Sequence, residues 1–114
     1  MENCLFCRII KGEIPSTKVY EDEHVYAFKD INPATPVHVL VVPKVHIDSI
    51  EALNDNNIEN TTHIHRAIKK VAEITGINKD GYRVIINCGK DGGQTVFHLH
   101  YHVLGGTKLT EKII

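Results

Sequence analysis

Three histidines at alternate positions, His98, His100 and His102, are the residues of this chain best suited to chemistry. A neutral imidazole nitrogen can attack phosphorus, and a second imidazole can give a proton to a leaving group near neutral pH. The stretch around them, Gln94 to Leu104, is rich in β-branched, aromatic and aliphatic residues, which favours a strand. Side chains alternate faces along a strand, so all three rings would point one way. The simpler interpretation is a half-buried strand whose histidines contact only water.

A glycine-rich loop leads directly into this stretch and favours the chemical interpretation. It reads Cys88-Gly-Lys-Asp-Gly-Gly93, and glycines let backbone N–H groups approach a ligand closely enough to hold phosphate oxygens. Asn87, Gln94 and Thr95 add neutral hydrogen-bonding groups at the same place. A nucleophilic imidazole beside a phosphate-binding loop predicts transfer of a phosphoryl or nucleotidyl group.

Cys4 and Cys7 form a second constellation near the N-terminus. On a helix, residues three apart share a face, so both thiols could reach one metal ion, with two further ligands from elsewhere. The chain has three cysteines, and an odd number in a reducing compartment indicates thiols or metal ligands rather than a disulfide framework. The alternative is a pair of reduced thiols packed on a sheet. Cys88 is most simply a small residue at a strand end.

Length and composition indicate one ordinary globular domain. The chain has 114 residues, of which 42% are hydrophobic and 24% charged. Its formal net charge of -1 gives no electrostatic reason to expect DNA, RNA or an acidic membrane as a partner. The apolar runs are too short to span a bilayer, and the first residues do not resemble a signal peptide. We therefore expect a cytoplasmic protein.

Turn signals and changes of hydrophobic period divide the chain into short elements. Asn3 is expected to cap a helix over residues 4–11 that Gly12 ends. Alternation and β-branched runs predict strands, and helical spacing predicts one long helix that Gly76 ends. The expected strands cover residues 18–21, 24–30, 37–43 (a central strand) and 82–87, a helical turn lies within 48–53, and the long helix spans 57–75. This order predicts an α+β fold with a mostly antiparallel sheet.

One face of the expected long helix is apolar, and the opposite face carries charged residues. His63 and His65 fit this helix as residues at its surface or facing a partner. The apolar face consists of Ile58, Thr61, Ile64, Ala67, Ile68, Val71, Ala72 and Ile74.

The sequence His98-Leu-His-Tyr-His-Val-Leu104 resembles the signature of the histidine-triad (HIT) family, His-φ-His-φ-His-φ-φ with φ apolar. The resemblance covers nearly the whole chain. Segments 6–15, 20–33, 41–46 and 87–104 are similar to the nucleotide-binding (Hint) branch. It implies a single HIT domain over residues 1–114, with a mostly antiparallel five-stranded sheet, one long and one short helix, and assembly into a homodimer.

The resemblance also implies a role for individual residues. His100 would be the nucleophile, His102 would contact the same phosphate and manage the leaving-group proton, and His38 would support the nucleophile. Asp30 would bind the ribose hydroxyls. Threonine at position 95, where the branch commonly has serine, keeps the hydroxyl but stiffens the side chain. The remaining nucleotide-binding residues would be Phe6, Ile9, Phe28 and Ile31 around the purine, and Asn87, Gly93, Gln94 and Thr95 near the phosphate.

Some bacterial proteins that this chain resembles bind zinc through a cysteine pair and two histidines. The corresponding residues here are Cys4, Cys7, His46 and His98. A Cys₂His₂ site with no open position would be structural, so the chemistry itself would require no cofactor.

The predicted function is that of a purine nucleotide-binding hydrolase, a nucleoside phosphoramidase of the adenosine 5′-monophosphoramidase type. It would act through a nucleotidyl-His100 intermediate and bind AMP or GMP. Two alternatives remain at this point: a nucleotide-binding regulatory module whose turnover is incidental, and a dinucleoside polyphosphate hydrolase.

Overall fold

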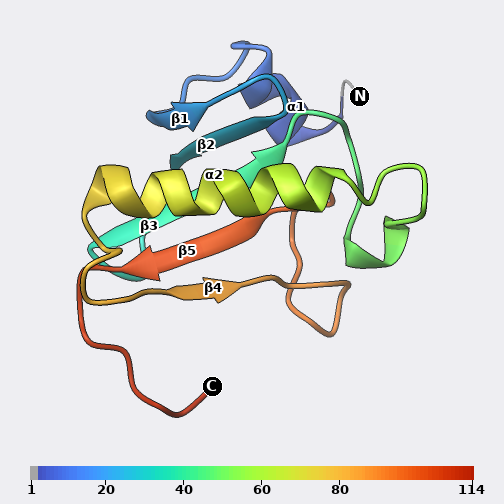
Figure 1. The fold of residues 1–114 in the computed structure, drawn as a ribbon. Helices are drawn as coiled ribbons and strands as arrows, with labels where there is room; N and C mark the ends of the chain where they lie inside the picture. The colour runs from blue at the N-terminus through green and yellow to red at the C-terminus, as the bar shows by residue number, and fades with distance from the viewer. Residues whose placement is uncertain (1–2) are drawn as a thin grey trace.

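The computed structural model, which describes residues 3–114, contains a five-stranded antiparallel sheet and two α-helices (Figure 1). The strand order is β1-β2-β3-β5-β4, and each neighbouring pair is antiparallel. The predicted α+β fold with one long and one short helix is therefore confirmed. The elements are α1 (Leu5–Ile10), β1 (Lys18–Glu21), β2 (Val25–Lys29), β3 (Val37–Pro43), the 3₁₀ turn η1 (Ile50–Ala52), α2 (Asn60–Thr75), β4 (Arg83–Ile85) and β5 (Tyr101–Gly105).

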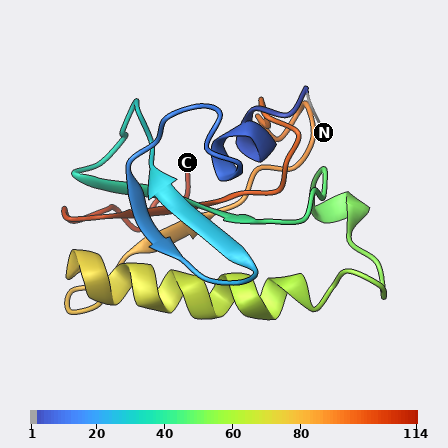
Figure 2. The ribbon, with the colours of Figure 1, turned by 90° about the horizontal axis from the view of Figure 1, so that it is seen from above.

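The two helices cover opposite faces of the sheet, which creates two separate cores (Figure 2). Strand β3 contributes to both: Val39 and Val41 pack with the buried residues of α2, whereas Leu40 and Val42 pack with α1. A strand buried on both faces needs a continuous apolar run, which is why residues 37–43 form the central strand as predicted.

Strand β5 is shorter than the sequence predicts, because it begins at Tyr101 rather than near Gln94. Its partner β3 ends at Pro43, which has no N–H to continue the ladder beyond the Val41–Tyr101 pair. The preceding segment is held by other bonds, including one from Leu99 N to the Ile47 carbonyl at 2.6 Å. The predicted alternation still holds, since Leu99, Tyr101 and Val103 all pack into the core under α2.

Helix boundaries also differ from the prediction. The N-cap of α1 is Cys4 rather than Asn3, because the Cys4 sulfur accepts a hydrogen bond from the Cys7 N–H. Helix α2 begins at Asn60 rather than residue 57, since residues 54–59 form separate turns stabilised by the Asn54 and Asn57 side chains. At its other end Ile74 is 58% exposed, so it does not belong to the buried face.

Strand β1 has the predicted bounds, whereas β2 and β4 are correct in place but shorter than predicted. Strand β2 covers residues 25–29 instead of 24–30, because the Asp22 carboxylate binds the His24 and Val25 N–H groups and so closes the turn there. Strand β4 covers 83–85 instead of 82–87. Among residues 3–114, the helices lack the length and hydropathy that crossing a bilayer requires.

Candidate functional site

His100 lies just before β5, on the sheet face that carries α1. The residue is only 7% exposed, and its ring packs against Phe6 in a T-shaped arrangement, with 5.0 Å between ring centroids and an interplanar angle of 87°. The Nδ1 atom lies 2.7 Å from the backbone carbonyl of His98. Because a carbonyl only accepts, Nδ1 must carry the proton, which leaves the Nε2 lone pair available for attack.

His38 and His102 form a hydrogen-bonded pair beside it, and their tautomers follow from their neighbours. The Ala34 N–H donates to Nδ1 of His38 at 3.0 Å, so a neutral His38 carries its proton on Nε2. That Nε2–H donates to Nδ1 of His102 at 2.9 Å. His102 then carries its own proton on Nε2, where it can be donated to a ligand. Sequence reasoning missed Ala34 because a backbone N–H leaves no trace in residue type.

The Asp30 carboxylate lies 3.4 Å from Nε2 of His38, and its other oxygen accepts from the Asn32 N–H at 2.8 Å. Asp30, His38 and His102 are close enough to be considered as metal ligands. The hydrogen bond from Ala34 argues against this, because it requires the proton to stay on the very nitrogen that would bind the ion. We therefore read this group as a proton-handling pair supported by a carboxylate.

The environment lowers the pKa of both His100 and His102. Burial lowers the pKa of His100 below its ordinary value, partly opposed by the bond to the His98 carbonyl and by the charge of Asp30. Burial lowers the pKa of His102 to about 4, and the positive charges that His100 and His38 would carry lower it as well. A neutral His100 is the nucleophilic form.

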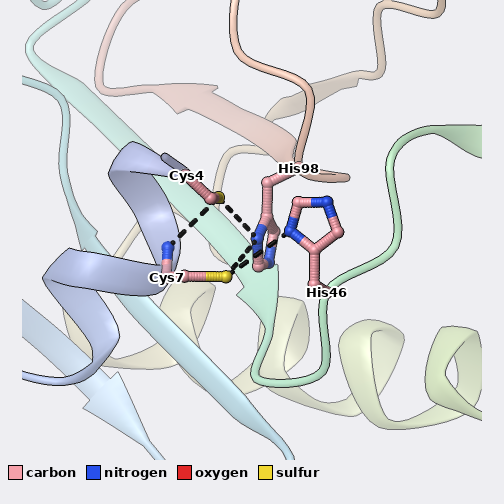
Figure 3. Close-up of side chains that lie close together, drawn as sticks. All are labelled: Cys4, Cys7, His46 and His98. Carbon is pink, nitrogen blue, oxygen red and sulfur yellow. Dashed lines mark hydrogen bonds between the residues drawn. The ribbon is translucent and has the colours of Figure 1, made fainter. Parts of the chain in front are cut away.

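The side chains of Cys4, Cys7, His46 and His98 point toward one another (Figure 3). Nδ1 of His98 lies 3.3 Å from the Cys4 sulfur and 3.5 Å from the Cys7 sulfur, and Nδ1 of His46 lies 3.4 Å from the Cys7 sulfur. All four donor atoms lie within 4.8 Å of one another. A tetrahedral zinc site, with Zn–N near 2.0 Å and Zn–S near 2.3 Å, places its ligand atoms roughly 3.3–3.8 Å apart. The donor set and its spacing therefore fit zinc.

The outer nitrogens of the two histidines are also bound, as metal-ligating imidazoles require. Nε2 of His98 donates to the Pro43 carbonyl at 2.8 Å, and Nε2 of His46 donates to the Asp48 carboxylate at 2.6 Å. Both Nδ1 atoms are thus left as acceptors facing the sulfurs. Burial lowers the pKa of His98 to about 4, which keeps it in the neutral form that binds metals. The His46-x-Asp48 spacing could have indicated Asp48 from the sequence.

The glycine-rich loop is tightly constrained. A Cβ on Gly92 would lie 2.4 Å from the Cys88 carbonyl oxygen, so no larger residue fits there without a shift. The Gln94 side chain is buried and fully engaged: its oxygen accepts from Gly89 N at 2.9 Å, and its amide donates to the Asp48 and Val96 carbonyls. Gln94 therefore ties the loop to the segment after β3.

Comparison with known proteins identifies the family. The HIT domain model matches residues 11–109, which include His38, His46 and the triad. This chain belongs to the HIT family.

Its relatives include enzymes and a metal-binding protein. A HIT family hydrolase from Clostridium thermocellum is 58% identical, with a TM-score of 0.98 over 100% of this chain and 99% of that one. The purine nucleoside phosphoramidase of Escherichia coli K12 is 44% identical over 95% of this chain and 91% of its own length. The 14 kDa zinc-binding protein of Zea mays is 47% identical over 92% and 83%. The predicted family is confirmed, and the chain is a hydrolytic enzyme of the HIT family.

The residues predicted to wall the purine do not all come together in this HIT domain. Phe6 and Phe28 pack edge to face at 5.5 Å, and Ile9 is buried in the same core. Ile31 is 90% exposed and lies in the turn between β2 and β3. Thr95 is exposed, and the Asn87 amide donates to the Gly92 carbonyl at 2.7 Å.

A large surface cavity of the HIT domain lies elsewhere. It measures about 740 Å³ and is formed where the end of α2 meets the C-terminal segment, with Gly76, Tyr82 and Lys108 among its lining residues. It brings no cluster of nucleophiles and bases together, so we locate the candidate active site by the histidines and not by volume.

Proposed function

We propose that this HIT protein is a purine nucleotidyl hydrolase of the nucleoside phosphoramidase type, with AMP or GMP as product. The observation that carries the proposal is the tautomer of His100: the bond to the His98 carbonyl directs its unprotonated Nε2 away from the backbone. The relation to a purine nucleoside phosphoramidase supports the choice of substrate.

In the first step, Nε2 of His100 attacks the phosphorus of a nucleoside phosphoramidate. The N–P bond to the leaving amine breaks, and its electron pair goes to the amine nitrogen. The negative phosphate favours the protonated form of the neighbouring His102, which takes up a proton with the substrate and gives it to the amine. The Asp30 carboxylate, 3.4 Å from His38, stabilises the pair while it is positively charged.

In the second step, water attacks the nucleotidyl-His100 phosphorus. The bond to Nε2 breaks and returns its electron pair to the ring, while the proton released by water goes to the His102–His38 pair. Backbone N–H groups of the glycine-rich loop, with Asn87 and Thr95 beside them, hold the phosphate oxygens during both steps, while Gln94 fixes the loop through its bonds to Gly89, Asp48 and Val96. The carboxylate of Asp30 also binds the ribose hydroxyls, and Phe6, Ile9, Phe28 and Ile31 border the purine.

The test is to trap the intermediate. Adenosine 5′-phosphoramidate is mixed with the enzyme, the reaction is quenched in base, which preserves phosphohistidine, and peptides are mapped by mass spectrometry. An adenylyl group on His100 is expected in the native enzyme and no adduct in His100→Ala. His65→Ala, an exposed histidine of α2 on the other sheet face, is the matched control and should retain the adduct. Turnover by His100→Ala, or an adduct on another residue, would refute the assignment.

We also propose that Cys4, Cys7, His46 and His98 hold a structural zinc ion, as their spacing and outer hydrogen bonds favour. The relation to a zinc-binding protein of Zea mays is consistent with this. Metal analysis of the purified protein should give about one zinc per chain. A protein that binds no zinc when it is supplied at micromolar concentration would contradict the proposal.

The protein is further proposed to form a homodimer. Strand β4 is an edge of the sheet, and its Val84 is 39% exposed; Tyr82 and Ile74 add exposed apolar surface. Light scattering should give a mass near twice 12.8 kDa. A monomer at micromolar concentration would contradict this.

A further inference from the structure

We infer that the cluster of Cys4, Cys7, His46 and His98 positions the catalytic pocket, and that Asp48 is the positioning residue that links this cluster to the phosphate-binding loop. The inference deepens the proposed function and rests on it for the identity of the ligand. Its physical basis is three chains of contacts that leave the cluster and end at His100 or at the glycine-rich loop.

The first chain of contacts runs through His98 itself. Its buried ring is held at both nitrogens, by the two sulfurs at 3.3 and 3.5 Å and by the Pro43 carbonyl at 2.8 Å. The backbone carbonyl of the same residue accepts the Nδ1–H of His100 at 2.7 Å. The bonds that fix the His98 ring therefore also fix the acceptor that sets the tautomer and direction of His100.

The second runs through Phe6, which lies between the two cysteines on α1. Its ring meets the His100 ring edge-on at 5.0 Å and the His98 ring at 6.0 Å. Helix α1 has only six residues, too few to be stable without tertiary contacts, so its position depends on its packing in the core and on the contacts that Cys4 and Cys7 make. Movement of α1 would therefore remove one wall of the nucleophile.

The third runs through Asp48, and it reaches the phosphate-binding loop. The Asp48 carboxylate accepts from His46 at 2.6 Å, while its backbone carbonyl accepts from the Gln94 amide at 2.7 Å. The oxygen of that amide accepts from Gly89 N at 2.9 Å. One residue thus joins a cluster histidine to the two ends of the glycine-rich loop.

These contacts matter because the segment between the loop and β5 has no sheet ladder of its own. It is held instead by Leu99 N on the Ile47 carbonyl, by Gln94 and by His98. All three attachments are to residues 43–48, the segment that carries His46. When the cluster is ordered, the pocket should therefore be ordered as well. The expected consequences are tighter nucleotide binding and a single His100 tautomer.

The test compares zinc-loaded and chelator-treated protein, with AMP as the ligand. Protein labelled with ¹⁵N in histidine is observed by NMR, because the ring nitrogen shifts report which nitrogen carries the proton. In the loaded protein His100 should show the Nδ1–H tautomer alone. After zinc removal it should show exchange between both tautomers, and the AMP dissociation constant should rise by about tenfold or more. Circular dichroism confirms that both samples are folded at the temperature used.

A milder variant serves if removal of zinc unfolds the protein. Asp48→Asn keeps the backbone carbonyl that binds Gln94 but weakens the support of His46, so zinc affinity should fall roughly 10- to 100-fold. When zinc is titrated into the variant, tight AMP binding should then appear only at the higher zinc concentration that saturates its metal site. Glu51→Gln, an exposed acid in η1 that loses the same charge, should behave as the native protein.

The outcomes separate this inference from the proposed function. If zinc removal changes the AMP dissociation constant by less than twofold and leaves the His100 ring nitrogen shifts unchanged, the cluster only stabilises the fold and the inference is wrong. If Asp48→Asn leaves zinc affinity unchanged, the role of Asp48 is wrong. If His100 responds to zinc but phosphoramidates are not hydrolysed, the inference stands and the proposed function fails.

Discussion

The two histidine clusters of this molecule use the same side chain in opposite ways. In the cysteine–histidine cluster, the outer Nε2 atoms of His46 and His98 bind protein oxygens and the Nδ1 atoms face the sulfurs. In the candidate active site, the Nδ1 atoms of His100 and His102 are bound to protein neighbours and the Nε2 atoms are left to meet a ligand. The first arrangement directs imidazole nitrogens into an enclosed cysteine–histidine cluster, and the second makes imidazole nitrogens available to an incoming ligand.

This difference shows that residue type does not decide the role of a histidine; the partner of its other nitrogen does. His98 and His100 lie two positions apart on the same face, yet Nδ1 of His98 faces the two cysteine sulfurs and Nδ1 of His100 donates to a backbone carbonyl. The following predictions test how separate the two clusters are, from the largest expected effect to the smallest.

Substitution of His100 should abolish turnover without affecting metal binding by the other cluster. His100→Ala removes the proposed nucleophile, so turnover of adenosine 5′-phosphoramidate should fall on the order of 10⁴-fold. The zinc content should stay near one per chain, because His100 supplies no ligand to the cluster. Steady-state kinetics and metal analysis of the same preparation measure both. Loss of zinc together with activity would show that the two clusters are one structural unit.

Substitution of a cysteine should affect the cysteine–histidine cluster and, through it, the stability of the fold. Cys7→Ser weakens metal binding, and loss of a ligand present at about 100 times its dissociation constant costs about 2.7 kcal/mol of unfolding free energy. For a domain of this size, the melting temperature should fall by roughly 10 °C. Cys88→Ser, which changes a cysteine outside the cluster, should retain both zinc and melting temperature. Equal melting temperatures for the two variants would contradict a structural metal at Cys7.

The pH dependence of stability and of kcat/KM should reflect the burial of His102. The pKa of His102 is depressed to about 4 in the folded protein, whereas an unfolded histidine titrates near its model value of 6.5. Below pH 6.5 the unfolded chain therefore binds the proton first, so this contribution to stability is lost as the pH falls from 6.5 towards 4. The acid limb of kcat/KM should likewise lie below 6.5, since it reports the free enzyme. An acid limb centred at pH 6.5 would mean that His102 is solvated.

The smallest effect is expected at the rim of the pocket. Thr95→Ser keeps the hydroxyl near the phosphate and removes only one exposed methyl group. The value of kcat/KM for adenosine 5′-phosphoramidate should change by less than about threefold, as surface substitutions of this kind usually do. Thr95→Val, which keeps the shape but removes the hydroxyl, should lower it further. Equal values for the two variants would exclude a role for the hydroxyl.

The sequence by itself determined the features that depend on local periodicity. Alternation placed Leu99 and Tyr101 on the core side and the triad on the other, and the apolar run of residues 37–43 indicated the central strand. The spacing of Cys4 and Cys7 put both thiols on one side of a short helix. These features follow from the 2.0 and 3.6 residue periods of strand and helix, which any reader of the sequence can count.

Only the tertiary structure decided where strand β5 begins and which nitrogen of each histidine remains available. The start at Tyr101 depends on Pro43 of another strand, and the tautomer of His102 depends on the Ala34 N–H through His38. The sequence also gave no sign that Gln94 is occupied by Asp48 and Gly89. Hydrogen bonds between distant segments have no sequence period, so they become visible only when the chain has folded.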